Sequence, residues 1–157
     1  FDITEDLPAI TAAVRGPLEN PEYHVVVDVG GNDSGARILK QFRKYLVGDD
    51  VELFCVLNGN RMETDTVEGM LEHLHSIEAE TGLKFDGIIN NTHMLTETTV
   101  GDVVKGYKLC SEVSEKLGIP VVWNTCLEDL MDDWEPLMEI ENIYPMKLYM
   151  RPSWLDR

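Results

Sequence analysis

The sequence has few basic residues, and this shortage limits the functions that it can serve. Only 13 of its 157 residues are Lys or Arg, against 29 Asp or Glu, which gives a formal net charge of −16. Because most of such a surface would repel a phosphate backbone, the composition argues against a general nucleic-acid-binding protein. No apolar run approaches the roughly 20 residues that a membrane-spanning helix needs, so no membrane span is expected.

Patterns typical of disulfide or metal chemistry are also missing. The three cysteines, Cys55, Cys110 and Cys126, include no CxxC pair and lie among apolar neighbours. Such a set is typical of reduced thiols in a cytoplasmic protein. His73 and His75 lie two residues apart in a predicted helix and therefore point to different sides, so no zinc site is expected.

The sequence does contain a regular alternation of short apolar strands and amphipathic helices. Its length suits one domain, and 43% hydrophobic residues are enough to build a core. The hydrophobic periodicity predicts strands at 25–28, 52–57, 87–90 and 121–123, helices at 4–14, 34–46, 64–81, 99–117 and 127–138, and a last strand or extended tail at 143–150. Thr99 with Asp102 resembles an N-terminal capping pair, Gly82 and Gly118 are expected to end their helices, and Arg15-Gly16-Pro17 is expected to break the first helix.

This alternation predicts an α/β fold with an open, mainly parallel sheet and helices on both of its faces. The strands are almost continuously apolar, as expected where both faces are covered. We therefore expect Val26, Val56, Ile89 and Val122 to be almost fully buried. Because ligands bind at the carboxyl ends of the strands in such sheets, the residues that follow each strand are the candidate site.

The first predicted strand ends in an aspartate that is followed by glycines. Asp28 and Gly31 have the Asp-x-x-Gly spacing that P-loop NTPases use, in which the carboxylate holds Mg²⁺ and the glycine amide approaches the terminal phosphate. A helix N-terminus follows directly and favours an anion. The alternative is an ordinary glycine-rich turn between a strand and a helix, with Ser34 as the N-cap.

The other strand ends are polar as well. Arg61 lies in the loop after the second strand, where it could meet a phosphate or a partner, or be a solvated loop residue. Asn90 and Asn91 follow the third strand, and Thr125 follows the fourth. Asparagine offers a donor and an acceptor together, which is what reading the edge of a base requires.

The phosphate loop itself does not occur. The chain contains no G-x-x-x-x-G-K-[ST] motif and no Gly-Lys dipeptide. Without that loop and its lysine, the chain cannot cradle the β- and γ-phosphates of a triphosphate in the usual way.

Several segments nonetheless resemble one family. The stretch from Asp28 to Arg37, which reads DVGGNDSGAR, is similar to the "DVGG-x-D-x-GAR" segment of bacterial P-loop ATPases in the CobQ/CobB/MinD/ParA group. Glu68-Gly69, the segment 87–93 with Thr98-Thr99, and the segment 117–120 also resemble that group. The likeness runs from about residue 6 to the end of the sequence.

The resemblance implies a deviant-Walker ATPase that binds ATP and Mg²⁺. It implies that Asp28 is the aspartate on the Mg²⁺ side and that Gly31 senses the γ-phosphate. The candidate nucleotide-binding residues are Gly30, Asn58, Arg61, Asn90, Asn91 and Thr125.

The family members carry their phosphate loop near the start of the domain. We therefore expect residues 1–157 to be a single domain that forms the C-terminal two-thirds of such an ATPase, inactive alone, with an apolar sheet edge or face left uncovered. A homodimer and an unknown protein partner are further expectations. The alternative is a non-catalytic α/β module that binds a protein through its strand ends or through the basic helix face around residues 37–44.

Overall fold

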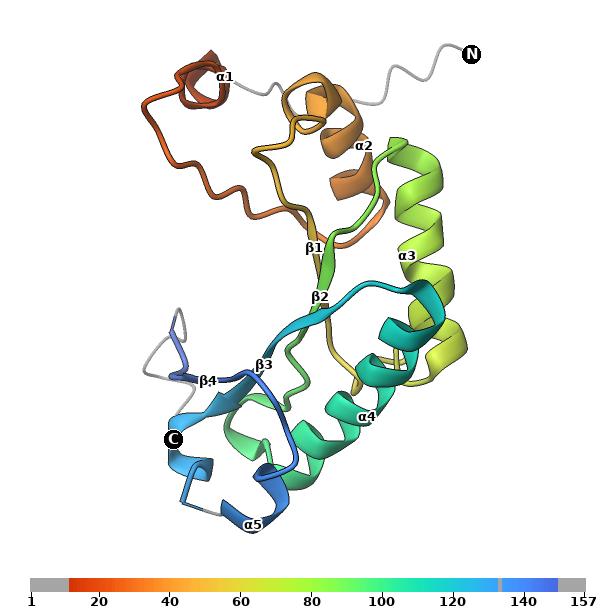
Figure 1. Cartoon of the computed structure of the whole chain (residues 1–157), viewed down its shortest axis with the longest axis vertical. Coiled ribbons are helices and arrows are strands. Elements are labelled where there is room, and N and C mark those ends of the chain that lie inside the picture. Colours follow the sequence, from red (N-terminus) through yellow and green to blue (C-terminus); the bar gives the residue numbers. More distant parts are fainter. Residues whose placement is uncertain (1–11, 133, 150–157) are drawn as a thin grey trace.

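The computed structural model describes residues 12–132 and 134–149, and four short parallel strands form its centre (Figure 1). They follow one another in the sheet in the order β1-β2-β3-β4, and every pair is parallel. The predicted α/β class with an open parallel sheet is confirmed. The strands are β1 (Phe54–Leu57), β2 (Gly87–Asn90), β3 (Val121–Leu127) and β4 (Ile143–Met146).

Helices connect the strands and precede the sheet. None of the described helices is long and apolar enough to cross a membrane. The α-helices are α1 (Ala12–Glu19), α2 (Asp33–Phe42), α3 (Val67–Thr81), α4 (Val100–Leu117) and α5 (Trp134–Leu137), and short 3₁₀ turns occupy Arg43–Tyr45, Leu95–Glu97 and Glu128–Leu130.

Local capping signals placed both ends of α4 and the end of α3 correctly, whereas α3 begins at Val67 and not at the predicted residue 64. Thr99 and Asp102 form a reciprocal capping box at the start of α4, as predicted. Gly82 and Gly118 end α3 and α4 with φ near +69°, a conformation that glycine adopts without strain. The cap of α2 is Asn32, whose side chain accepts a hydrogen bond from the amide of Gly35, rather than Ser34.

The predicted ends of the shorter helices were less accurate. Helix α2 ends at Phe42 and gives way to a 3₁₀ turn, although the periodicity predicted helix to residue 46. Helix α1 runs through Gly16 and Pro17, where a break was expected. The predicted helix at 4–14 falls mostly outside the described residues.

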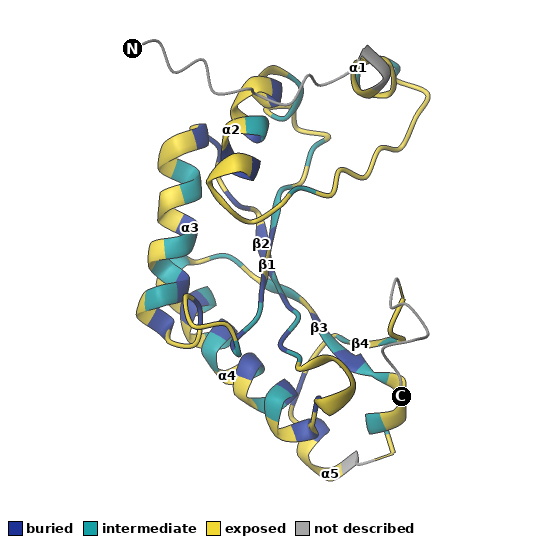
Figure 2. Cartoon of the chain, turned by 180° about the vertical axis from the view of Figure 1, so that it is seen from behind, coloured by how far each residue is buried: buried dark blue, intermediate teal, exposed yellow. Residues whose placement is uncertain are grey.

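The main core lies between one face of the sheet and the two long helices. Cys55, Leu57 and Ile88 point from the strands toward α3 and α4, and Met70, Leu74, Cys110 and Val113 meet them from the helices. Figure 2 shows the buried sides of both helices turned to the sheet. Burial raises the pKa of the Cys55 and Cys110 thiols to about 12, so both are protonated at neutral pH.

The opposite face of the sheet is not covered by a described helix, and here the burial prediction was wrong. Val56 is 58% exposed, and Ile89 and Val122 are only partly buried. The reason is the topology of the sheet. Strand–helix–strand crossovers all have the same hand, and here each new strand is added on the same side of the one before it. Every connecting helix therefore lies on the same face of the sheet. Helices on both faces require a reversal of the strand order.

The strand predicted at 25–28 was also wrong. Residues 23–29 are extended but form no ladder with the sheet, and Val26 is 97% exposed. A run of β-branched residues favours extended backbone, but a strand also needs a neighbour whose backbone groups it can pair with. Among the described residues, none supplies that neighbour, and the segment bows away from β1 (Figures 1 and 2).

Candidate functional site at the carboxyl ends of the strands

A buried pair of asparagines joins the carboxyl end of β2 to the middle of β3. Asn90 Nδ2 donates to Asn124 Oδ1 at 2.9 Å, and Asn90 Oδ1 accepts from both the backbone amide and the hydroxyl of Thr92, at 3.2 and 2.7 Å. Asn124 Nδ2 in turn donates to the carbonyl of Glu141 at 2.9 Å. All three side chains are fully buried, so these bonds satisfy groups that would otherwise be costly to bury.

The loop after β1 is tied to the same cluster. The amide of Gly59 donates to Thr92 Oγ1 at 2.9 Å. Asn58 holds the backbone of His93 from both sides, because its Nδ2 donates to the carbonyl at 3.2 Å and its Oδ1 accepts from the amide at 3.3 Å. In this structure the amides of Asn58 and Asn90, two predicted ligand residues, therefore serve mainly to join strand ends.

Helix α4 lies so close to this cluster that only glycine fits at one position. A Cβ on Gly106 would lie 2.1 Å from Thr92 Oγ1 and 2.3 Å from Asn90 Oδ1. Both atoms belong to hydrogen-bonded buried groups that cannot move without losing a partner. Gly106 thus sets the distance between α4 and the sheet.

A second polar link, which the sequence analysis missed, joins the loop after β1 to the first turn of α4. Asn60 Nδ2 donates to Asp102 Oδ1 at 2.7 Å, and Lys105 Nζ donates to Asn60 Oδ1 at 3.1 Å. Partial burial opposes ionisation of Asp102, but the hydrogen bonds from Thr99 and Asn60, with the charge of Lys105, lower its pKa overall. The capping signal marked Asp102, but nothing in the sequence indicated its partner 42 positions away.

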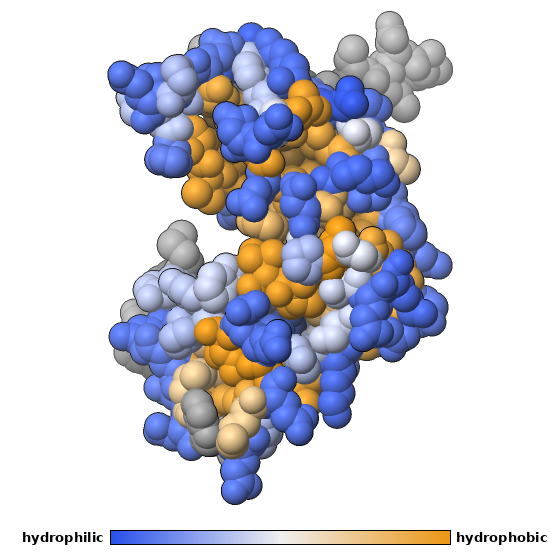
Figure 3. All heavy atoms as spheres, in the orientation of Figure 1, coloured by the Kyte–Doolittle hydropathy of each residue, from blue (hydrophilic) through white to orange (hydrophobic). Residues whose placement is uncertain are grey.

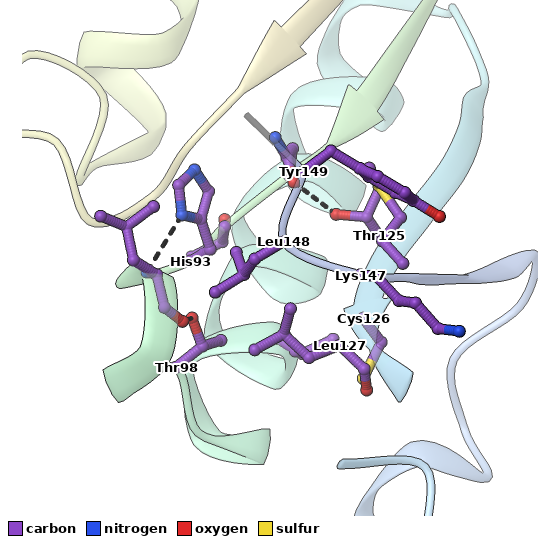
Figure 4. Close-up of a pocket in the computed structure, with 13 residues that line it drawn as sticks. His93, Thr98, Thr125, Cys126, Leu127, Lys147, Leu148 and Tyr149 are labelled. Carbon is purple, nitrogen blue, oxygen red and sulfur yellow. Dashed lines mark hydrogen bonds between the residues drawn. The ribbon is translucent and has the colours of Figure 1, made fainter. Parts of the chain in front are cut away.

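A cavity of about 240 Å³ opens beside this cluster, at the carboxyl ends of β2, β3 and β4. Its apolar wall includes Leu95, Val103, Leu127, Met146 and Leu148, and its polar groups come mainly from the ends of β2 and β3 (Figure 4). Small-molecule sites usually enclose about 300–1,000 Å³. The cavity is therefore sized for one part of a ligand, such as a planar ring, rather than for a whole nucleotide.

Asn91 and Thr125 provide the polar edge of this cavity. Thr125 Oγ1 donates to Asn91 Oδ1 at 2.6 Å, which fixes the orientation of the asparagine amide. No hydrogen bond within the described residues uses Asn91 Nδ2. The cavity thus offers a free amide donor beside a hydroxyl that can still accept, and both belong to the predicted ligand set.

Arg61 lies near two histidines at the same end of the sheet. His93, which lines the cavity, and His73 on α3 both have a lowered pKa, mainly because they are partly buried. The positive charge of Arg61 lowers the pKa of both, whereas Glu63 raises that of His73. Both imidazoles are therefore neutral at pH 7 and can act as donor or acceptor.

The glycine loop before α2 reaches this group from the other side. A Cβ on Gly31 would lie 3.7 Å from His73 Nε2, so Gly31 packs beside that imidazole. Gly30 lies next to it and contacts the turn at Gly35. Gly31 thus lies beside His73, and the charge of Arg61 acts both on His73 and on His93, which lines the cavity.

Asp28 stands apart from these contacts. It is exposed, and no hydrogen bond or ion pair joins it to another described residue. In the part of the chain that the structure describes, no group of three or more His, Cys, Asp or Glu is placed to hold a metal ion. Asp28 could supply one Mg²⁺ ligand, and Mg²⁺ commonly takes one or two carboxylates with water and substrate phosphates for the rest.

Comparisons with protein-family models, curated proteins and solved structures gave no match.

The close contact at Gly106 gives a direct test of the site's architecture. We expect Gly106→Ala to lower the free energy of unfolding by about 1–3 kcal/mol, the usual cost of forcing a methyl group into a packed interior. The matched control is Gly101→Ala in the same helix, where the new Cβ would meet only Thr99 Oγ1 at 3.4 Å. That change should be neutral or stabilise by up to about 1 kcal/mol. Urea denaturation measures both, and equal effects would contradict the proposed close approach.

The charge of Arg61 gives a second test. Removing it in Arg61→Ala should raise the pKa of both His73 and His93, because a nearby positive charge disfavours the imidazolium form. Glu63→Gln should lower the pKa of His73, whose charged form Glu63 stabilises. NMR titration of the imidazole protons measures each shift. If Arg61→Ala left both histidines unchanged, Arg61 would not lie at this site.

Proposed function

We propose that residues 1–157 carry the base side and the γ-phosphate-sensing side of an ATP site, in a nucleotide-dependent switch or partner-activated ATPase of the MinD/ParA-like class. The observation that carries the proposal is the Asn91–Thr125 pair at the edge of the cavity. The donor and the acceptor lie side by side and suit the edge of a purine, and the apolar wall suits its face. The carboxyl end of a parallel sheet is also where such ligands bind.

In this proposal the phosphate end of the nucleotide points toward Arg61 and the glycine loop. Arg61 supplies positive charge near the cavity, and Gly31 lies beside His73 with no side chain of its own to obstruct a phosphate. Asp28 would hold Mg²⁺ at this end, and the N-terminus of α2 would add a favourable dipole. The β- and γ-phosphates still need a phosphate loop, which residues 1–157 do not contain.

A non-catalytic interaction module is the second candidate. The observation that favours it is the apolar sheet face opposite α3 and α4, which the described residues leave exposed. The two candidates differ in what the cavity binds, so ligand binding at Asn91 and Thr125 separates them.

Binding of the base alone tests the proposal on this chain. Adenosine should cause saturable NMR shifts at Asn91, His93 and Thr125, and Thr125→Val, which removes the hydroxyl that orients Asn91, should weaken binding by about tenfold, the effect of one neutral hydrogen bond. Thr96→Val, a change of the same kind at an exposed position, should have no effect. Shifts confined to other regions would contradict a base site in this cavity.

Catalysis is tested on a parent protein that also carries a phosphate loop. Residues 1–157 alone should bind Mg-ATP weakly or undetectably, because the loop supplies most of the charge stabilisation. In the parent, Asp28→Ala should reduce steady-state hydrolysis by at least about a hundredfold, the scale of losing one well-placed electrostatic group. Asp49→Ala, at another exposed aspartate, is the control. Normal turnover in the Asp28→Ala protein would make Asp28-x-x-Gly31 a structural turn.

A further inference from the structure

The sheet presents an apolar row on its uncovered face. The register of the strands places Val56 beside Ile89 and Ile89 beside Trp123. Trp123 is 43% exposed and Tyr144 is 53% exposed, and their rings meet edge to face with centroids 5.7 Å apart. Exposed apolar side chains that are contiguous in this way are typical of an interaction site.

Two backbone edges beside this row are also free. β1 pairs with β2 on one side, and on its other side it has no strand among the described residues. The extended segment 23–29 also has no ladder partner in the described part of the chain, although it carries three consecutive exposed valines, Val25, Val26 and Val27. Figure 3 shows a hollow at this side of the molecule, with hydrophobic surface along its wall. An open edge beside an apolar wall is a template for strand addition.

The negative charge near the free edges favours one kind of added strand. The two stretches that contain the free edges, residues 20–29 and 49–58, have no Lys or Arg, and their five acidic residues are Glu22, Asp28, Asp49, Asp50 and Glu52. A second copy of this chain is a poor occupant, because each copy carries a net charge of −16. A basic segment would instead be attracted.

We propose that an extended polypeptide segment, apolar in its centre and positively charged at its flanks, adds as a strand to the free edge of β1. It is supplied from outside residues 1–157, and it lies between β1 and the segment 23–29. Its backbone pairs with the two free edges, and its apolar side chains on the open face lie beside Val56 and extend the row that continues through Ile89 and Trp123. This is β-strand addition, in which the main chain gives affinity and the side chains give specificity.

Three synthetic peptides test this proposal on the full 157-residue chain. The first has a Val-Ile core flanked by lysines, the second is identical but N-methylated at alternate core residues, and the third has glutamate in place of lysine. The lysine peptide should bind saturably, with NMR shifts in β1 and in residues 23–29. The N-methylated peptide should lose binding, because it cannot donate the ladder hydrogen bonds. The glutamate peptide should bind at least about tenfold more weakly.

A matched pair of variants locates the binding surface. Val56→Ser should weaken binding of the lysine peptide at least about threefold, because it removes apolar contact at the end of the row that borders the free edge. Val47→Ser is the control: Val47 is 59% exposed, against 58% for Val56, but it lies in the loop before β1. Equal loss in both variants would overturn the proposal, as would equal binding of the methylated peptide or no peptide binding at millimolar concentration. Self-association of the chain through Val56, measured by sedimentation equilibrium, would also overturn it.

Discussion

The buried hydrogen bond between Asn90 and Asn124 is the interaction on which the rest of the carboxyl edge depends. It joins the last residue of β2 to the middle of the neighbouring strand β3, and it orients the carbonyl oxygen of Asn90 toward Thr92. Thr92 then holds Gly59, so the end of β1 is fixed by the same group. Because a buried amide without a partner costs about 1–3 kcal/mol, the members of this cluster support one another. The cavity is formed by the residues that follow directly, including Asn91 and Thr125.

The same topology explains why the molecule has a well-packed side and an open side. Strands added in one direction place α3 and α4 on a single face, and that face contains the main core. The other face keeps Val56 and Trp123 exposed, and no strand within residues 12–132 and 134–149 pairs with the outer edge of β1. The two proposals are therefore complementary: the carboxyl edge holds part of a ligand site, and the open edge offers a place where further polypeptide can complete the sheet. Each can fail without the other.

Features that depend on neighbouring residues could be predicted from the sequence, and features that depend on distant ones could not. Thr99, Asp102 and Gly118 marked the ends of α4, because capping is local. The exposure of Val56 depends on strand order, and that of Val26 on the lack of a neighbouring strand among the described residues, so neither could be foreseen from the local sequence. Clustering of the strand-end asparagines was predictable from a parallel sheet. Asn90 is buried, whereas Asn91 faces the cavity. This difference follows from the alternation of side chains between the two faces of a strand, a signal that the sequence analysis did not use.

The central claim is that a rigid, hydrogen-bonded carboxyl edge coexists with an unpaired edge in one chain, and native-state amide hydrogen exchange tests it most directly. The amides of Gly59 and Thr92, which donate to buried side-chain oxygens, should exchange only through global or near-global unfolding. The amides of Val25, Val26 and Val27, which have no hydrogen-bond partner among the described residues, should exchange at close to the rate of an unfolded chain. Protection of these valines equal to that of β2, or rapid exchange at Gly59 and Thr92, would contradict the account.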